Sequence, residues 1–435
     1  MNKLNTIDLF AGCGGLTDGF EQTGFYNTLA CVEWEKKPCE TLVQRLHDKW
    51  NVIDAQQRVM RFDVQRIDEL FNGWRNDKDF GTHKGLSALV GNQEVDLIVG
   101  GPPCQAYSIA GRIRDENGMN DDYRNFLFES YLEVVKKFKP KAFVFENVEG
   151  LLSANPGGIS IVERITKGFN EIGFEISTDL RKYALLDCSK FGVPQVRKRL
   201  IILGINREYI TENPQIALFE FYKIMLRKFI VAEPMTVKQA IGDLPKMYPL
   251  DNQIKINSRK LSHEYLQSLD ILNNLPRTHS KRDIEVFKLL TEDIESGRNE
   301  YVKIDALKEL YTKITGKLSN VHKYHVLRLD KPSNTIPAHL YKDGLRHIHP
   351  DSKQARTITV REAARLQTFD DDFEFLGSQQ DQYKMIGNAV PPKFANIVAT
   401  ATKEFFDKYY GTILHKETSV SRIRKPETRR AVVTG

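Results

Sequence analysis

The sequence predicts an α/β fold, with a doubly wound, mostly parallel sheet followed by a second, smaller and irregular domain. Through the first two hundred residues, short runs rich in Val, Ile and Phe alternate with amphipathic stretches. Beyond about Arg207 this alternation stops, and polar loops rich in Lys, His and Tyr continue to about Asp381. Apolar strands that alternate with helices are typical of a sheet covered on both faces.

The expected elements follow one another in a regular order. Runs rich in β-branched and aromatic residues are interpreted as strands, and segments with apolar residues three or four apart as helices. In chain order we expect a strand in TIDLF, a helix over 16–22, a strand in NTLACVE, a helix over 36–47, strands in RFDV and VDLIVGG, a helix in NFLFESYLEVVKKF, a strand in AFVFENV, a helix in ISIVERITKGFNEIGF and a strand in RLIILGIN.

The C-terminal block returns to a helical period after a Gly-Asn turn and a double proline, in QYKMIGNAVPPKFANIVATATKEFF. We expect this block to dock on the first domain, which would then be discontinuous. The expected division is a first domain over 1–205, a small domain over 206–381, a returning C-terminal helix over 382–411 and a basic tail over 412–435.

Charge and composition narrow the function classes only modestly. The chain has 435 residues, 41% of them hydrophobic, and a formal charge of +6. From Thr412 onward there are six Lys or Arg against two Glu, so the rest of the chain is nearly neutral. A slightly basic balance is compatible with a nucleic-acid partner but does not require one. The tail is interpreted either as a phosphate-contacting arm or as a solvated terminus.

The sequence also predicts where the protein works. No apolar run approaches the ~20 residues of a membrane span, and the N-terminus leaves no room for a signal peptide. We therefore expect a cytoplasmic protein with no membrane partner. The cysteines are odd in number and lack metal-ligand spacing, so reduced thiols are expected, with neither disulfides nor a metal site: Cys13, Cys31, Cys39, Cys104 and Cys188.

A glycine-rich turn follows the first expected strand, in DLFAGCGGLTDGF. Gly12 and Gly14 allow the backbone to approach a nucleotide, and Glu33 lies about where an acidic residue binds ribose hydroxyls. The pattern is not G-x-G-x-x-G, so a nucleoside without phosphates fits as well as a dinucleotide. Trp34 could stack on an adenine, and Asp63 ends the expected third strand. The alternative is a tight turn without a ligand.

The stretch VGGPPCQAYS holds Cys104 behind two prolines and two glycines, at the carboxyl end of a buried strand. Open α/β sheets bind ligands at this edge. Proline fixes φ and glycine permits close approach, so the thiol would face a cleft in a rigid segment. A thiol needs a positive or dipolar neighbourhood to become a ready nucleophile. Taken alone, such a cysteine is also compatible with a small core residue.

Two later strands add charged side chains. FVFENVEG places Glu146 at a strand end, where it could cap structure or exchange a proton with a ring nitrogen of a substrate. FGVPQVRKRLIILG places Arg197 and Arg199 two residues apart, hence on one face of a strand. Two guanidiniums on one face could hold a carboxylate, a phosphate or a carbonyl oxygen. As a bare charge pair they would also suit a solvated edge strand.

Together these segments resemble the DNA (cytosine-5) methyltransferase family of the restriction-modification type. Six segments match its motifs in the family's order: DLFAGCGG, GGPPCQAYS, ENV, QVRKR, ARTITVREAARLQTF and QYKMIGNAVPP. The resemblance covers about residues 5–205 and 330–410. It implies a Rossmann-like fold that uses S-adenosyl-L-methionine, with residues 1–205 as the catalytic and cofactor-binding domain. The variable region over about 206–329 would be the target-recognition region.

The resemblance also implies roles for single residues. Cys104 would add to carbon 6 of the cytosine, and Glu146 would hold the ring nitrogen at position 3 and the exocyclic amine. Arg199 would contact the base carbonyl, and Arg197 would support the active-site geometry. Glu33 would take the ribose hydroxyls, and the other cofactor-binding residues would be Phe10, Gly12, Gly14, Trp34, Asp63, Val64, Pro103, Leu127 and Asn388.

The expected partner is double-stranded DNA, from which the target base is flipped at a cost of a few kcal/mol. The polar loop QAYSIAGRIRDENGMNDDYR offers Ser108, Arg112 and Arg114 to phosphates. Family members often have a polar residue near Ala110, so which side chain fills the gap left by the base stays open. Candidate base contacts in the variable region are Arg259, His263, Lys323, Tyr324 and the KDGLRHIH turn, and KPSNTI resembles the motif that organises that region.

Three alternatives remain at this point. A related branch of the same fold methylates transfer RNA with the same thiol chemistry, although the long variable region favours duplex DNA. A nucleotide-dependent oxidoreductase would use the glycine turn but leaves PPCQ, ENV and QVRKR unexplained. A non-catalytic DNA-binding protein would be expected to lack the thiol or the glutamate, and both are present. We expect a monomer in a prokaryotic cell, with a separate cognate restriction endonuclease as a further partner.

Overall fold

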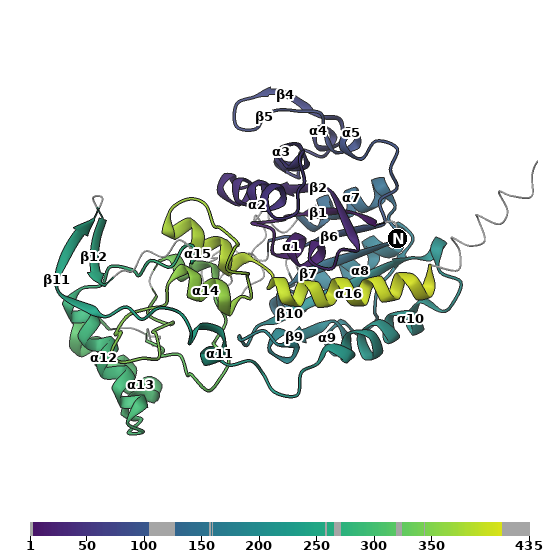
Figure 1. Ribbon diagram of the computed structural model, residues 1–435. Helices are drawn as coiled ribbons and strands as arrows, with labels where there is room; N and C mark the ends of the chain where they lie inside the picture. The colour runs from purple at the N-terminus through teal and green to yellow at the C-terminus, as the bar shows by residue number, and fades with distance from the viewer. Residues whose placement is uncertain are drawn as a thin grey trace, which may run out of the picture.

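The architecture was obtained from a computed structural model, which describes residues 3–103, 127–155, 158, 160–256, 259–264, 271–318, 324–342 and 344–410. Figure 1 shows a sheet with helices on both faces and a second lobe that extends away from it. Cys104, Ser108, Arg112 and Arg114 lie outside the described residues, as does the basic tail over 412–435.

The central sheet has the strand order β3-β2-β1-β6-β7-β10-β8, with β9 paired to β10. Parallel pairing joins β1 to β2 and β6, β2 to β3, and β6 to β7, whereas β10 is antiparallel to β7, β8 and β9. The doubly wound, mostly parallel sheet is therefore confirmed. The strands are β1 Leu4–Leu9, β2 Tyr26–Glu33, β3 Val59–Arg61, β6 Leu97–Gly100, β7 Ala142–Asn147, β8 Phe174–Glu175, β9 Leu185–Asp187 and β10 Lys198–Asn206.

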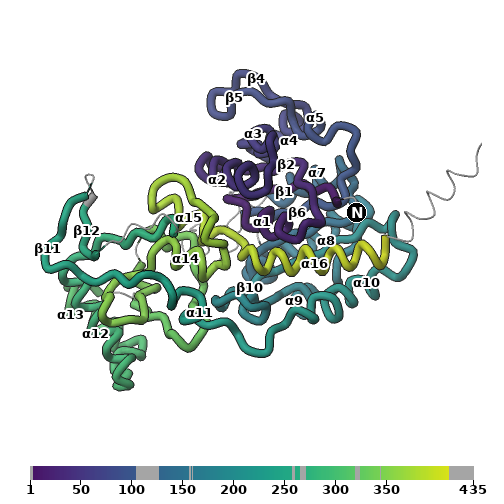
Figure 2. Tube along the Cα trace, in the orientation of Figure 1, coloured from purple at the N-terminus to yellow at the C-terminus, as the bar shows by residue number. Residues whose placement is uncertain are grey.

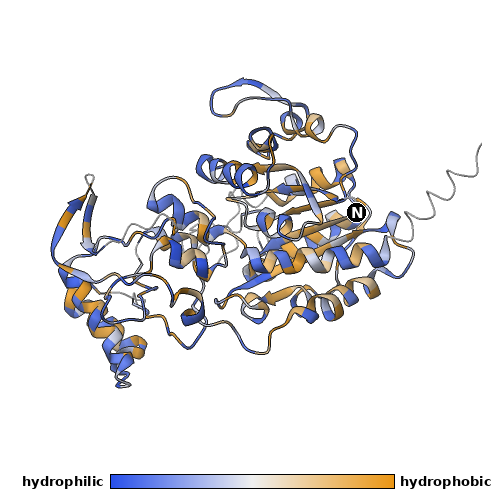
Figure 3. Cartoon of the chain, in the orientation of Figure 1, coloured by the Kyte–Doolittle hydropathy of each residue, from blue (hydrophilic) through white to orange (hydrophobic). Residues whose placement is uncertain are grey.

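Helices cover both faces of this sheet because the strands are apolar on both sides. Figure 3 shows hydrophobic residues concentrated on the strands and on the faces of the helices that meet them. Ile7, Ile98 and Val144 are among the buried strand residues. The helices of this part are α1 Gly15–Glu21, α2 Lys36–Asp48, α3 Ala55–Arg58, α4 Ile67–Asn72, α5 Leu86–Val90, α7 Leu127–Phe138, α8 Ile161–Glu171, α9 Leu180–Tyr183 and the C-terminal α16 Pro392–Tyr409.

The C-terminal helix α16 packs against the N-terminal helix α1, and Figures 1 and 2 show the two side by side. A Cβ at Gly19 would lie 2.4 Å from the carbonyl oxygen of Pro392, so only glycine allows the helices to approach this closely. The hydroxyl of Tyr26 donates to the carbonyl of Ala399 at 2.7 Å and fixes the middle of α16 to β2. These contacts place α16 on the first domain.

The segment after β10 also belongs to the core of the sheet. It comprises α10 Pro214–Glu220, η6 Phe221–Met225 and η7 Leu226–Phe229, and it buries Leu218, Phe221 and Met225. The hydroxyl of Tyr222 accepts from the amide of Leu203 and donates to the carbonyl of Ile201, both at 2.9 Å. This packing favours a domain boundary after Phe229 rather than at 205.

The smaller lobe has its own hydrophobic clusters and little sheet. One cluster surrounds Ile336, Phe373 and Ile386, and another packs the helical hairpin formed by α12 and α13. A buried ion pair between Arg356 and Glu362, at 2.7 Å, ties the segment before α14 to that helix. The elements of this lobe are α11 Val237–Ile241, β11 Pro249–Ile256, β12 Arg259–His263, α12 Lys281–Glu295, η8 Glu300–Val302, α13 Ile304–Thr315, η9 Ala338–Tyr341, α14 Val360–Leu366 and α15 Gln379–Asn388.

A short hairpin leaves the first domain between α4 and α5. It is formed by β4 Trp74–Asp77 and β5 Gly81–His83, which pair antiparallel, and it stands out at the edge of the molecule in Figure 1. Across the parts of the chain that the structure describes, we find no helix with the length and hydropathy needed to cross a membrane.

Candidate active site

The glycine-rich turn lies at the carboxyl end of β1 and is held by Glu33 at the end of β2. The Glu33 carboxylate accepts the amide of Gly12 at 2.9 Å and the amide of Glu35 at 2.7 Å. Gly12 has a φ of +57° and a Cβ there would meet nothing within 4 Å, so the turn borders open space. Gly14 instead faces Leu42, because a Cβ at Gly14 would lie 2.5 Å from a methyl group of that leucine.

Burial perturbs the two carboxyls nearest this turn. Asp8 at the end of β1 accepts a hydrogen bond from the Thr17 hydroxyl at 2.6 Å, and burial raises its pKa to about 7. Burial also raises the pKa of Glu33, although the amides of Gly12 and Glu35 favour its charged form. Each Glu33 oxygen keeps acceptor capacity beyond the single amide it binds.

The residues expected around an adenine gather at the same edge of the sheet. Glu33 lies opposite Arg61 in the parallel pairing of β2 with β3, so Trp34 and Asp63 follow neighbouring strands at the same end. The Trp34 side chain is 54% exposed, which is high for an indole. Asp63 accepts the amide of Gln65, and Val64 is buried behind it.

A segment near the C-terminus reaches the glycine turn from the other side. A Cβ at Gly15 would lie 2.4 Å from the carbonyl oxygen of Val390, so the chain around Asn388 rests against the start of α1. The Asn388 side chain is exposed. Phe10, with a φ of 60°, is partly buried, as is Pro103, and Leu127 is buried at the start of α7.

Glu146 and Arg199 face one another across the antiparallel strands β7 and β10. Their side chains form an ion pair at 2.7 Å, and each is only about one-eighth exposed. The next residue, Asn147, donates from its side-chain amide to the carbonyl of Pro102 at 3.1 Å. This bond fixes the segment that leads into Cys104 beside the Glu146 carboxylate.

Gly101 sets the distance between that segment and Glu146, a role that the sequence did not indicate. A Cβ on residue 101 would lie 2.5 Å from a Glu146 carboxylate oxygen. We predict that Gly101→Ala displaces the carboxylate without unfolding the protein, because the clash involves the end of a flexible side chain. A displacement of the carboxylate by about 1 Å is expected to lower kcat by about 10- to 100-fold. Single-turnover kinetics and the melting temperature check this, and an unchanged kcat would contradict it.

Arg197 lies close to Arg199 in sequence but has different partners. It is 1% exposed and donates to the carbonyls of Ile336, Gly387 and Ala389 at 2.9 to 3.1 Å. It therefore lies in the interior, between the two lobes, and not on a solvated edge strand. Because Arg197 precedes β10, the alternation of a strand does not place it with Arg199.

Two glutamines reinforce this junction, and the sequence did not predict them. Gln195 accepts the amide of Ile336 at 2.8 Å and donates to Gln367 at 2.5 Å. Gln367 in turn donates to the carbonyls of Ile386 and Ala389. Both lie inside the motifs QVRKR and ARLQTF, but a motif does not show which distant backbone groups a side chain reaches.

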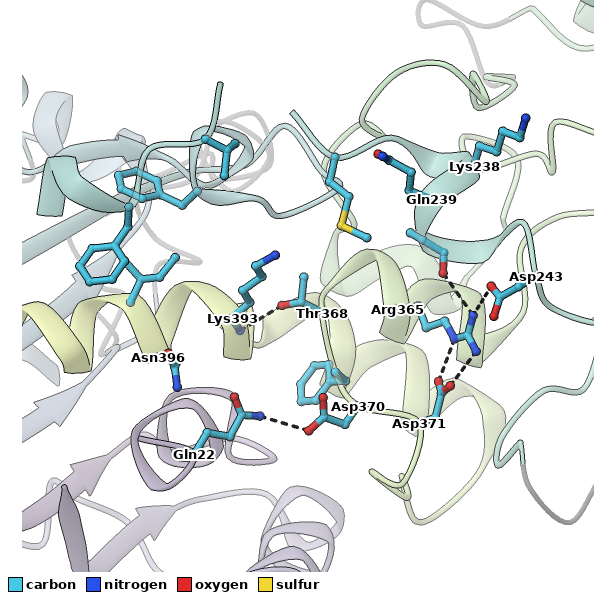
Figure 4. Close-up of a pocket in the computed structure, with 17 residues that line it drawn as sticks. Gln22, Lys238, Gln239, Asp243, Arg365, Thr368, Asp370, Asp371, Lys393 and Asn396 are labelled. Carbon is cyan, nitrogen blue, oxygen red and sulfur yellow. Dashed lines mark hydrogen bonds and ion pairs between the residues drawn. The ribbon is translucent and has the colours of Figure 1, made fainter. Parts of the chain in front are cut away.

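A separate hollow lies between the lobes, with a cavity volume of about 880 Å³. Figure 4 shows Lys238, Arg365 and Lys393 around it, with Arg365 bound to Asp243 and Asp371. Its lining includes neither Glu146 nor the glycine turn, so it is distinct from the candidate active site. Within the described ranges no cluster of three or more His, Cys, Asp or Glu side chains is suited to a metal ion.

Comparisons with a family model and with known proteins all point to one protein family. A family model described as C-5 cytosine-specific DNA methylase matches residues 4–404. The Type II methyltransferase M.Bpa9945I of Bacillus paralicheniformis is 33% identical over 93% of this chain and 99% of its own length. The Type II methyltransferase M1.HphI of Haemophilus parahaemolyticus is 30% identical over 92% of this chain and 86% of its own.

Solved structures support the fold. A protein of E. coli described as a DNA modification methyltransferase encoded within a prophage has a TM-score of 0.57 at 22% identity, covering 93% of this chain and all of its own. The Dnmt2 methyltransferase of S. pombe has a TM-score of 0.51 at 16% identity, covering 93% of this chain and 99% of its own.

Proposed function

Because the chain belongs to the C-5 cytosine-specific DNA methylase family and is a DNA (cytosine-5) methyltransferase of the type II restriction-modification class, we propose the following reaction. It methylates carbon 5 of one cytosine within a specific double-stranded DNA sequence, with S-adenosyl-L-methionine as the donor. The target base is flipped out of the duplex, and Cys104 forms a covalent bond to carbon 6. The observation that carries this proposal is the Glu146–Arg199 pair beside the segment that leads into Cys104.

The residues around the glycine turn fit the proposed cofactor. Open space at Gly12, the Glu33 carboxylate with acceptor capacity to spare and the exposed Trp34 indole form a cradle for a nucleoside. When bound there, S-adenosyl-L-methionine supplies an electrophilic methyl group. In this proposal Glu33 binds the ribose hydroxyls, and the residues that frame the rest of the cofactor are Phe10, Gly14, Trp34, Asp63, Val64, Pro103, Leu127 and Asn388.

The chemistry on cytosine follows from the weakness of carbon 5 as a nucleophile. Addition of the Cys104 thiolate to carbon 6 converts the ring to an enamine and makes carbon 5 reactive. Glu146 accepts a hydrogen bond from the exocyclic amine and exchanges a proton with the ring nitrogen at position 3, which neutralises the charge that the thiolate brings and stabilises the adduct. Arg199 orients Glu146 through their ion pair and contacts the base carbonyl. Once carbon 5 has taken up the methyl group, a base removes the proton that remains on carbon 5, and elimination breaks the bond to carbon 6 and releases the Cys104 thiolate.

The two lobes supply the DNA contacts in this proposal. Ser108, Arg112 and Arg114 bind phosphates near the flipped base, and the smaller lobe reads the sequence. Arg197, Gln195 and Gln367 join the lobes at the active site and so position one against the other. We further propose that the enzyme acts as a monomer in the cytoplasm of a prokaryotic cell, alongside a cognate restriction endonuclease.

The reaction is tested by expressing the chain in cells and sequencing their DNA after bisulfite treatment. We expect protected cytosines at one recurring sequence. A parallel assay with tritiated cofactor compares unmodified plasmid with bulk transfer RNA, and label is expected in the plasmid. Label confined to transfer RNA would refute the DNA substrate, and label in neither would refute the proposed reaction.

The cofactor assignment predicts a defect for Glu33→Gln. The glutamine replaces one carboxylate oxygen with an amide donor, so a backbone amide or a ribose hydroxyl loses its acceptor. We expect the dissociation constant for S-adenosyl-L-methionine to rise about 10-fold or more. Burial raises the pKa of Glu33, so this carboxylate takes up a proton as the pH falls. The protonated group is a poorer acceptor for the ribose hydroxyls, and cofactor binding by the wild type should therefore weaken at low pH.

Isothermal titration calorimetry measures both effects. Glu40→Gln is the matched control, because Glu40 lies on α2 and pairs with Lys37 at the surface. It should bind the cofactor as the wild type does. An unchanged dissociation constant in Glu33→Gln would refute the ribose assignment.

A further inference from the structure

A row of aromatic rings joins the β4–β5 hairpin to Trp34. The Phe80 ring, in the turn of the hairpin, meets the Trp34 indole with centroids 5.9 Å apart and an interplanar angle of 73°. Phe80 also meets Phe62, with centroids 5.2 Å apart, and Phe62 stacks on Trp74 at 3.7 Å. The row therefore runs from the buried core of the first domain to the exposed indole.

Two arginines fix the hairpin turn in this position. The Arg61 guanidinium lies 5.3 Å from the centre of the Phe80 ring and donates to the carbonyls of Asp79 and Trp34 at 2.8 and 3.4 Å. Arg66 lies over Phe62 and also pairs with Asp77 of β4 at 2.6 Å. The turn is thus tied to the ends of β2 and β3, where the cofactor cradle begins.

The exposure of the rings changes along the row. Phe62 is fully buried and Trp74 is 5% exposed, whereas Trp34 is 54% exposed beside Glu33. An indole that is supported at its side but open to solvent presents a flat apolar surface. Among the described residues, Phe80 is the only aromatic side chain that contacts the Trp34 indole.

We propose that Phe80 is a positioning residue for the cofactor, which holds the Trp34 indole in place for the adenine ring. This inference rests on the proposed use of S-adenosyl-L-methionine. Without Phe80 the indole can adopt more rotamers. The cofactor then has to order the indole when it binds, and this loss of entropy weakens the affinity for S-adenosyl-L-methionine. The hairpin then forms the outer support of the adenine site, although it lies outside the six motifs.

The test compares Phe80→Ala with Phe80→Tyr, which keeps the ring. By calorimetry, we expect Phe80→Ala to weaken S-adenosyl-L-methionine binding by about 3- to 10-fold and Phe80→Tyr to bind within about twofold of the wild type. At saturating cofactor, kcat should be unchanged in both. Phe25→Ala is the matched control, because Phe25 is an exposed ring next to Lys403 and precedes the amino end of β2, the end opposite Trp34. It should not affect binding.

A double-mutant cycle with Trp34→Ala separates positioning from a general loss of structure. If Phe80 acts through Trp34, then Phe80→Ala should cause little further loss once the indole is absent. Equal losses in both backgrounds would overturn the proposal, as would unchanged binding by Phe80→Ala. Should Phe80→Ala fail to fold, Phe80→Leu preserves apolar volume without the ring, and wild-type affinity in that variant would also overturn it. Failure of the wild type to bind S-adenosyl-L-methionine would instead refute the proposed function.

Discussion

Replacing Cys104 with serine is expected to lower methyl transfer by at least about 10³-fold, because the hydroxyl is a far weaker nucleophile than a thiolate. Cofactor binding should change little, since the cradle residues at the ends of β1 and β2 are untouched. Tritium transfer to DNA measures the first quantity and calorimetry with S-adenosyl-L-methionine measures the second. A serine variant that methylates at the wild-type rate would exclude covalent catalysis.

A second thiol near the site provides the control for this experiment. Cys188 is fully buried, and burial raises its pKa to about 12 although Arg197 and Arg199 favour the thiolate. It is therefore protonated at neutral pH, and Cys188→Ala should retain turnover. DNA that contains 5-fluorocytosine at the target should form a stable covalent complex with the wild type and with Cys188→Ala. A complex that forms equally well with Cys104→Ser would place the bond on another residue.

The sheet could be predicted from the sequence because its strands are short, apolar and separated by helices. The candidate site residues lie at strand ends, and the carboxyl ends of parallel strands meet at one edge of the sheet. The sequence could therefore predict that Glu33, Trp34 and Asp63 lie near one another. The β4–β5 hairpin was not predicted, because WRND and GTH lack alternating apolar residues. The hairpin is anchored by Trp74 stacking on Phe62 and by the contacts of Arg61 and Arg66, which only the folded chain reveals.

The parts of the site that escaped prediction depend on tertiary distances. The spacing of Arg197 and Arg199 predicted one shared face, but Arg197 lies just before β10 and turns to the carbonyls of the other lobe. Gly101 matters only because Glu146 is close enough to clash with a Cβ. The sequence placed α10 in the small domain, because the alternation of strands and helices stops near Arg207. In the folded chain the apolar face of α10 instead completes the core of the sheet.

The second large effect is expected at Glu146, where two substitutions separate binding from chemistry. Glu146→Gln keeps the shape of the side chain and can still hydrogen-bond a cytosine edge, but it cannot exchange a proton. Glu146→Ala removes those bonds and leaves the Arg199 guanidinium without its carboxylate partner. We expect turnover to fall by about 10²- to 10⁴-fold in both variants. Only Glu146→Ala should also weaken the binding of target DNA.

Glu149→Gln is the matched control for this pair. Glu149 lies three residues further along the chain, its side chain is 44% exposed, and its nearest cations are Arg181 at 3.8 Å and Lys198 at 3.6 Å. Exposed pairs of this kind contribute little, so its loss should leave turnover unchanged. Single-turnover rates and DNA dissociation constants are measured for all three variants. Glu146→Gln retains the hydrogen bonds to the cytosine edge and loses only the exchange of a proton. If this variant turned over at the wild-type rate, proton exchange by Glu146 would have no part in the mechanism.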